Sequence, residues 1–140
     1  MNEFYKLYYH HIFTEKVPEY LTEKQNKVEG PILIDFDFRY NISVKKRKHN
    51  SGHIIDIIDL YTSKLKDMCK ITAESFPIYV FEKPTPNIVE TDNITKDGIH
   101  MIIGVNMSHQ AQLYLRKLVL KEIGQVWSDL PIINSWESVL

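Results

Sequence analysis

Asp35 and Asp37 are separated by a single residue within an otherwise apolar run of the chain. If this run forms a β-strand, both side chains project from the same face, about 6 to 7 Å apart at a rise near 3.3 Å per residue. Two carboxylates at that separation can share divalent cations, because Mg²⁺ and Mn²⁺ prefer hard oxygen ligands. Such cations lower the pKa of an attacking hydroxyl and neutralise charge that develops on a triphosphate. The pair therefore indicates a candidate metal site for phosphoryl chemistry.

These two aspartates have a second interpretation, in which they form the solvated face of a half-exposed strand. Aspartate is among the residues least favoured in strands, and here it breaks that preference twice within three positions. Departures of this kind from local preference tend to mark functional sites. Both interpretations are kept, with Asp35 and Asp37 as candidate metal ligands.

Two further side chains could act beside the aspartates. His100 lies on another predicted strand, where its imidazole could donate a hydrogen bond to a phosphate oxygen. A histidine at such a position can equally be structural. Arg39 lies on the same strand face as both aspartates and could steady them by ion pairing or reach a phosphate itself. The sequence leaves both roles open for Arg39.

A basic segment, Lys45, Lys46, Arg47 and Lys48, directly follows the acidic strand. Clustered lysine and arginine side chains release counterions from phosphates, so this segment is a candidate contact with the backbone of a nucleic-acid template. A solvated loop is the alternative. The net charge of the whole chain is -1, so any nucleic-acid surface must be a local patch of this kind.

The histidines and the single cysteine do not indicate a zinc site. Cys69 is the only cysteine of the chain. No helix or strand spacing gathers His10, His11, His49 and His53 into a set of three or four ligands. We expect these histidines at the surface.

The elements that position the candidate residues follow from hydrophobic periodicity. Residues 31–40 are predicted to form a strand with one apolar face, made of Ile32, Ile34, Phe36, Phe38 and Tyr40. Apolar residues between Ile54 and Met68 recur at helical spacing, so residues 52–70 are predicted to form an amphipathic helix that covers this face.

Two more strands are predicted further along the chain. Residues 76–82 form a β-rich run, and residues 87–96 are predicted to form a loop. Asp97 and Gly98 are predicted to make a turn into a strand over residues 99–105, on which His100 projects away from an apolar row.

The remaining predictions concern the two ends of the chain. Ser108 is predicted to cap a helix that runs to about Trp127, and no finished element is predicted over residues 128–140. Residues 4–13 are predicted to be strand or irregular, and residues 17–25 to form a short helix.

The bulk properties are typical of one globular domain of mixed α and β structure, since the chain has 140 residues, of which 44% are hydrophobic and 25% charged. No apolar stretch approaches the roughly 18 residues that a membrane span needs, and the first residues lack the order of a signal peptide. We expect a cytoplasmic protein that is not secreted.

Several segments resemble the viral archaeo-eukaryotic primases, the kind fused to a helicase in nucleocytoplasmic large DNA viruses. Residues 31–40, Pro-Ile-Leu-Ile-Asp-Phe-Asp-Phe-Arg-Tyr, resemble their first motif, a hydrophobic strand that ends in Asp-x-Asp. Residues 96–103, Lys-Asp-Gly-Ile-His-Met-Ile-Ile, resemble their second motif, a strand whose histidine contacts the phosphates of the incoming nucleotide. Residues 76–84 and 127–138 also resemble segments of the giant-virus members, so the resemblance covers nearly the whole chain.

The resemblance implies an α+β fold of the archaeo-eukaryotic primase type, in which a mixed or antiparallel sheet related to the RNA-recognition motif packs against helices. It implies a DNA primase or primase-polymerase module of viral replication, which uses nucleoside triphosphates and Mg²⁺ or Mn²⁺ to make primers on a DNA template. Asp35 and Asp37 would be the catalytic metal ligands, and His100, with Arg39, would bind the nucleotide. A helicase domain, in the same or a neighbouring chain, is the implied partner.

The family also has a third motif, an acidic residue on a later strand, and this chain ends before it; Asp129 and Glu137 are poor substitutes. We therefore expect residues 1–140 to be a single domain, the amino-terminal part of a primase catalytic domain, incomplete at the C-terminus. A metal site that lacks one carboxylate retains its cations weakly, so the fragment is expected to be impaired or inactive alone. Two alternatives remain: a non-catalytic module that binds nucleic acid or docks on a replication partner, and a purely structural α+β domain.

Overall fold

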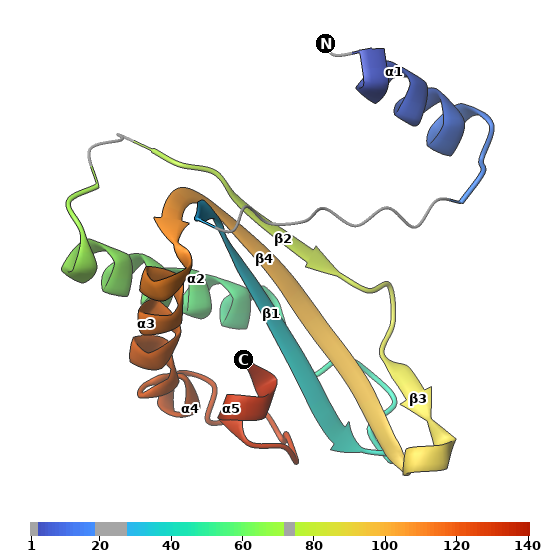
Figure 1. The fold of residues 1–140 in the computed structure, drawn as a ribbon. Helices are drawn as coiled ribbons and strands as arrows, with labels where there is room; N and C mark the ends of the chain where they lie inside the picture. The colour runs from blue at the N-terminus through green and yellow to red at the C-terminus, as the bar shows by residue number, and fades with distance from the viewer. Residues whose placement is uncertain (1–2, 19–27, 72–74) are drawn as a thin grey trace.

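The computed structural model describes residues 3–18, 28–71 and 75–140. Two long antiparallel strands lie side by side at its centre, β1 (Glu29–Asn41) and β4 (Ile94–Ser108). The short strand β2 (Ile78–Glu82) pairs with the other edge of β4, and β3 (Asn87–Val89) pairs with the beginning of β4. The strand order is therefore β1-β4-β2, and the helices that follow β1 and β4 gather beside this sheet (Figure 1). The predicted α+β class is confirmed, with antiparallel pairing between the described strands.

The strand predicted over residues 31–40 is confirmed by β1. Its side chains alternate, and the predicted apolar row is buried: Ile32, Ile34, Phe36, Phe38 and Tyr40. On β4 the same alternation buries Ile99, Met101 and Ile103 and leaves His100 exposed. This period of two places both apolar rows on the helix side of the sheet and the candidate polar residues on the opposite, open face.

Helix α2 (Ser51–Met68) confirms the helix predicted over residues 52–70. The Asn50 side chain accepts hydrogen bonds from the backbone N–H groups of Gly52 and His53, and the His53 ring accepts one from the Asn50 N–H. This reciprocal cap satisfies backbone donors that the first turn leaves free and fixes where the helix starts. The buried stripe of the helix includes Ile57, Leu60, Tyr61 and Leu65.

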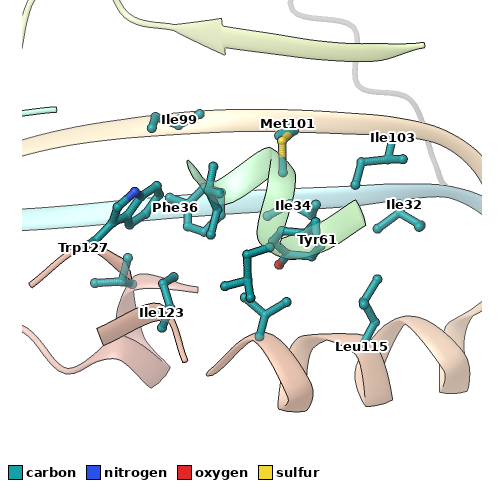
Figure 2. Close-up of a cluster of buried hydrophobic side chains, with 14 of the residues drawn as sticks. Ile32, Ile34, Phe36, Tyr61, Ile99, Met101, Ile103, Leu115, Ile123 and Trp127 are labelled. Carbon is teal, nitrogen blue, oxygen red and sulfur yellow. The ribbon is translucent and has the colours of Figure 1, made fainter. Parts of the chain in front are cut away.

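The core lies between the apolar face of the sheet and the helices (Figure 2). The Phe36 ring makes edge-to-face contacts with Trp127 and Tyr61, with centroid distances of 5.1 and 6.5 Å. Trp127 is fully buried, and its indole N–H donates to the His53 carbonyl at 3.0 Å. Strand, helix α2 and the C-terminal segment are therefore packed together at one aromatic cluster, which holds β1 in place beneath the open face.

The turn predicted at Asp97 and Gly98 is wrong, because β4 runs without a break from Ile94 to Ser108. Asp97 pairs with Phe38 within the β1–β4 ladder. Its buried carboxylate is ion-paired with Arg47, which lies far away in the sequence. This contact stabilises a strand at residues whose local propensity favours a turn, and local propensity does not include it. The loop predicted over residues 87–96 is also corrected: it contains β3, a 3-10 helix (Glu90–Asp92) and the beginning of β4.

The C-terminal part contains more structure than the sequence predicts. Ser108 caps α3 (His109–Leu120) as predicted, but this helix ends at Leu120, and the short α4 (Ile123–Val126) follows after a turn. Residues 128–140, for which the sequence predicts no finished element, contain α5 (Trp136–Val139). The Ile133 N–H donates to the Arg39 carbonyl at 2.8 Å, so this segment also covers part of the outer edge of β1.

The N-terminal residues 4–13 are helical, not extended, since α1 (Glu3–Tyr9) leads into a π-helix (His10–Thr14). Their aromatic and β-branched residues favour a strand by composition, which is why the sequence indicates the wrong element. The helix predicted over residues 17–25 falls almost entirely outside the described residues. None of the described helices is long and apolar enough to cross a membrane.

Candidate functional site

His100 and Asp35 face each other across the two central strands, where they are direct register partners. The His100 Nδ1 lies 3.1 Å from the Asp35 Oδ1, and both side chains are more than half exposed. Residues directly opposite each other in an antiparallel pair share a sheet face, so the β1–β4 ladder itself brings the imidazole to the carboxylate. Two candidate residues that the sequence places on separate predicted strands therefore form one exposed cluster.

Asp37 lies one step further along β1 on the same face. The Arg39 Nη2 is 3.6 Å from the Asp37 Oδ2, which matches the ion-pairing arrangement considered for this arginine. Both side chains are nearly half exposed, so this contact contributes little to stability and can open for a ligand. Asn134 fixes the backbone beneath them, because its side chain donates to the Asp37 carbonyl and accepts from the Arg39 N–H.

Gly98 is the register partner of Asp37 on β4. A Cβ atom at this position would lie 2.7 Å from the Phe36 carbonyl oxygen, which is closer than real Cβ atoms approach an oxygen. Glycine therefore allows the two strands to approach closely beside Asp37 and leaves the space above the strand unfilled.

A depression of about 220 Å³ surrounds these residues on the open face. Its polar side chains are those of Asp35, Asp37, Lys83, Asn87, Lys96 and His100. Asp97 also borders the depression, but its carboxylate is buried on the opposite face of the sheet, beside Arg47. The two lysines were not among the sequence-based candidates, because Lys96 falls in a predicted loop and Lys83 follows a strand end. The register would have identified Lys96, since it pairs with Arg39 on the same strand ladder. The depression combines carboxylates that can hold a cation with ammonium groups that attract phosphate.

Asp35 and Asp37 present hard oxygen donors to solvent on one face, which fits a divalent cation such as Mg²⁺ or Mn²⁺. Within residues 3–18, 28–71 and 75–140, no group of three or more carboxylate, histidine or cysteine side chains is arranged to hold a metal ion. Asp129 is turned toward His53, with 3.1 Å between carboxylate and ring nitrogen, rather than toward the aspartate pair. A cation here would take its remaining ligands from water or substrate phosphates.

Arg47 differs from the rest of the basic segment, because it is held by carboxylates of the protein. Its guanidinium makes two hydrogen bonds to Asp97, of 3.0 and 2.9 Å, and its Nη1 lies 3.4 Å from the Glu82 Oε2. The hydrogen bond to Asp97 raises the pKa of Arg47 further above its usual value. The other three members are exposed: Lys45, Lys46 and Lys48. Arg47 therefore anchors the segment. The three exposed lysines remain available for the expected contact with nucleic-acid phosphates.

His49 and His53, which we expected at the surface, are buried instead. Burial lowers the pKa of His49, and this effect exceeds the opposing influence of the nearby carboxylates of Glu82 and Asp97. The ring is therefore neutral at pH 7, and its Nε2–H donates to Glu82 at 2.5 Å. Both histidines are paired with residues far away in the sequence, Glu82 and Asp129, so local patterns do not predict their burial.

The fold and the site together define a class, an α+β domain whose open antiparallel sheet carries an acidic pair beside a histidine. A family model described as "C962R protein N-terminal AEP domain" matches residues 1–140. The chain belongs to this family of archaeo-eukaryotic primase (AEP) domains. The resemblance noted from the two motifs is thereby confirmed.

A similar protein is "Putative helicase L207/L206" of Acanthamoeba polyphaga mimivirus. It is 30% identical to the chain over 141 residues, which cover 99% of this chain and 14% of the mimivirus protein. The chain thus spans a small part of the length of this relative. No solved structure matches the chain.

Proposed function

We propose that this chain forms part of a viral DNA primase and contributes the metal-binding and phosphate-binding face for nucleotidyl transfer on a DNA template. The observation that carries this proposal is the register pairing of Asp35 with His100, with Asp37 one step along the same open face, in a chain of the AEP family. Sheet register fixes the relative positions of these three groups, as a site for one substrate requires.

Each polar group in the depression has a role in this proposal. Asp35 and Asp37 would hold Mg²⁺ or Mn²⁺, which when bound neutralises charge on the triphosphate and lowers the pKa of the attacking hydroxyl. His100 donates a hydrogen bond to a phosphate oxygen beside the cation. Arg39 orients Asp37 through the ion pair described above. Lys83 and Lys96, which line the same depression, attract the triphosphate.

A helicase domain is the proposed partner in the same or a neighbouring chain. This rests on the mimivirus relative, which is named a helicase and of which this chain matches only 14%. Priming and strand separation act on the same DNA, so a chain that carries both would make primers on the template that the helicase exposes.

The test is a calorimetric titration of the chain with Mn²⁺, with and without a nucleoside triphosphate. It is paired with a primer-synthesis assay on a single-stranded DNA template. We expect Mn²⁺-dependent nucleotide binding by the 140-residue chain. Primer synthesis is expected only from a longer chain that supplies another metal-binding carboxylate. Absence of metal-dependent nucleotide binding in both chains would refute the proposal.

A second candidate function is a non-catalytic module that binds nucleic acid or a replication partner. This candidate is favoured by the small number of carboxylates at the site, because the described residues place no third acidic side chain beside Asp35 and Asp37. The same titration separates the two candidates. Binding of single-stranded DNA without any metal-dependent nucleotide binding would support this module.

A further inference from the structure

The open face of the sheet continues past the acidic pair into an exposed apolar surface. Tyr79 and Phe81 on β2 are 55% and 52% exposed, whereas Ile78 and Val80 pack against the core from the other face. Aromatic side chains bury more apolar area than most others, so two of them standing in solvent at alternate positions of one strand indicate a binding surface.

The sheet register connects these rings to the candidate metal site. Phe81 is the register partner of His100, so the row across the sheet reads Asp35, His100, Phe81. Tyr79 is the register partner of Ile102, which pairs with the half-exposed Leu33 to form a second, apolar row. A depression of about 290 Å³ lies between the two rows, where it is lined by Leu33, Asp35, His100 and Ile102. The apolar surface and the metal site are therefore continuous.

Positive charge gathers at the end of β2 that follows Phe81. The Arg47 Nη2 donates to the Lys83 carbonyl at 2.6 Å, and its Nη1 contacts Glu82. Glu82 faces the helix side of the sheet, so these contacts place the basic segment on the side opposite to the two rings. On the rings' own face, Lys83 and Lys96 line the depression that contains His100, the register partner of Phe81. Exposed rings beside lysines are what single-stranded nucleic acid requires, since its bases stack on aromatic side chains and its phosphates attract ammonium groups.

We propose that Tyr79 and Phe81 form a stacking platform for two neighbouring bases of a single-stranded nucleic acid, which leads the template toward the metal site. The two side chains are about 6 to 7 Å apart along the strand, a spacing that accepts two unstacked bases. This inference rests on the proposed primase function in one respect, namely that the bound nucleic acid is the template. Binding of the single-stranded nucleic acid to the two rings requires neither metal nor catalysis.

The test measures binding of a fluorescein-labelled oligothymidylate to the 140-residue chain by anisotropy, at fixed low salt and with EDTA. Tyr79→Ala and Phe81→Ala are compared with Tyr114→Ala, an equally exposed aromatic residue on α3. Loss of one stacked base should weaken binding at least about fivefold for each platform ring, and Tyr114→Ala should leave it unchanged. Phe81→Tyr keeps an aromatic ring, so it should bind oligothymidylate as tightly as the unmodified chain and more tightly than Phe81→Ala. An oligomer of abasic sites of the same length should bind more weakly than oligothymidylate.

Three outcomes would overturn the platform. The first is unchanged affinity in Tyr79→Ala and Phe81→Ala, or equal binding of the abasic oligomer, since either would leave electrostatics as the sole interaction. The second is a loss confined to free nucleoside triphosphate, which would assign the rings to a nucleotide base. The third is absence of oligothymidylate binding by the unmodified chain, as expected if another polypeptide segment covers this face. Mn²⁺-dependent nucleotide binding, measured on the same variants, tests the proposed function separately.

Discussion

His100 and Asp35 are register partners on adjacent strands, and 3.1 Å separates the imidazole Nδ1 from the carboxylate Oδ1. Their proximity depends on the pairing of β1 with β4, because a slip of one residue would turn one of the two side chains to the opposite face of the sheet. The apolar rows of both strands, buried beneath the helices, fix that register. The core therefore determines the geometry of the polar cluster on the open face.

Asp35→Asn and Asp37→Asn should each weaken Mn²⁺ binding at least about tenfold, because each removes a negatively charged oxygen ligand without changing side-chain shape. Both side chains stand on the open face, so the free energy of unfolding should change by no more than about 0.5 kcal/mol. Calorimetric Mn²⁺ titration and urea denaturation measure the two effects. Asp67→Asn, at an exposed position on α2, is the matched control and should leave Mn²⁺ affinity intact. Equal affinity in all three variants would remove the metal site from this face.

His100→Ala should weaken Mn²⁺-dependent nucleotide binding by about tenfold or more, the usual cost of losing a hydrogen bond to a charged group. Binding of Mn²⁺ alone should change much less, since the aspartates remain. The His100 side chain is 58% exposed, so thermal stability should be preserved. Calorimetry with nucleoside triphosphate and a thermal melt give both quantities. A large drop in melting temperature with unchanged nucleotide affinity would instead identify a structural histidine.

The sequence predicts the long, periodic elements well and the short or charge-stabilised ones poorly. The strand around Asp35 and the helix after Asn50 are predicted because many residues in each repeat the same period. Strand β4 is predicted only from residue 99 onward, because Asp97 and Gly98 have turn propensities that the fold overrides with the Arg47 ion pair. Short elements such as β3 and α5 have too few residues to show a period.

The candidate site shows the same division. Asp35, Asp37 and His100 can be selected from the sequence because a polar residue in an apolar strand departs from local preference. The local sequence gives no sign of the role of Arg47, since the buried carboxylate to which it is hydrogen-bonded, that of Asp97, is 50 residues away. The role proposed for Tyr79 and Phe81 cannot be predicted from the local sequence either, because only the register shows that they share the face of His100.

Arg47→Met should lower the free energy of unfolding by about 3 to 5 kcal/mol, because it leaves the fully buried Asp97 carboxylate without its partner. Urea denaturation measures this loss, with Lys46→Met at an exposed neighbouring position as a control that should stay within about 0.5 kcal/mol. The double variant Arg47→Met, Asp97→Leu should recover part of the stability, since it removes both charges together. If Arg47→Met is as stable as Lys46→Met, the ion pair does not anchor the basic segment.

His49 should make the protein less stable as the pH falls below about 6.5. Burial lowers the folded-state pKa of His49 below its ordinary value of 6.5, so the unfolded chain takes up this proton first as the pH decreases. The contribution is therefore complete above pH 6.5 and is lost below it, by at most about 1.4 kcal/mol for each pH unit. His49→Gln cannot titrate, so the stability difference between the unmodified chain and this variant should shrink between pH 7.5 and 5.5. Urea denaturation across that range measures it, and parallel stability curves would show that the buried ring does not change its protonation on unfolding.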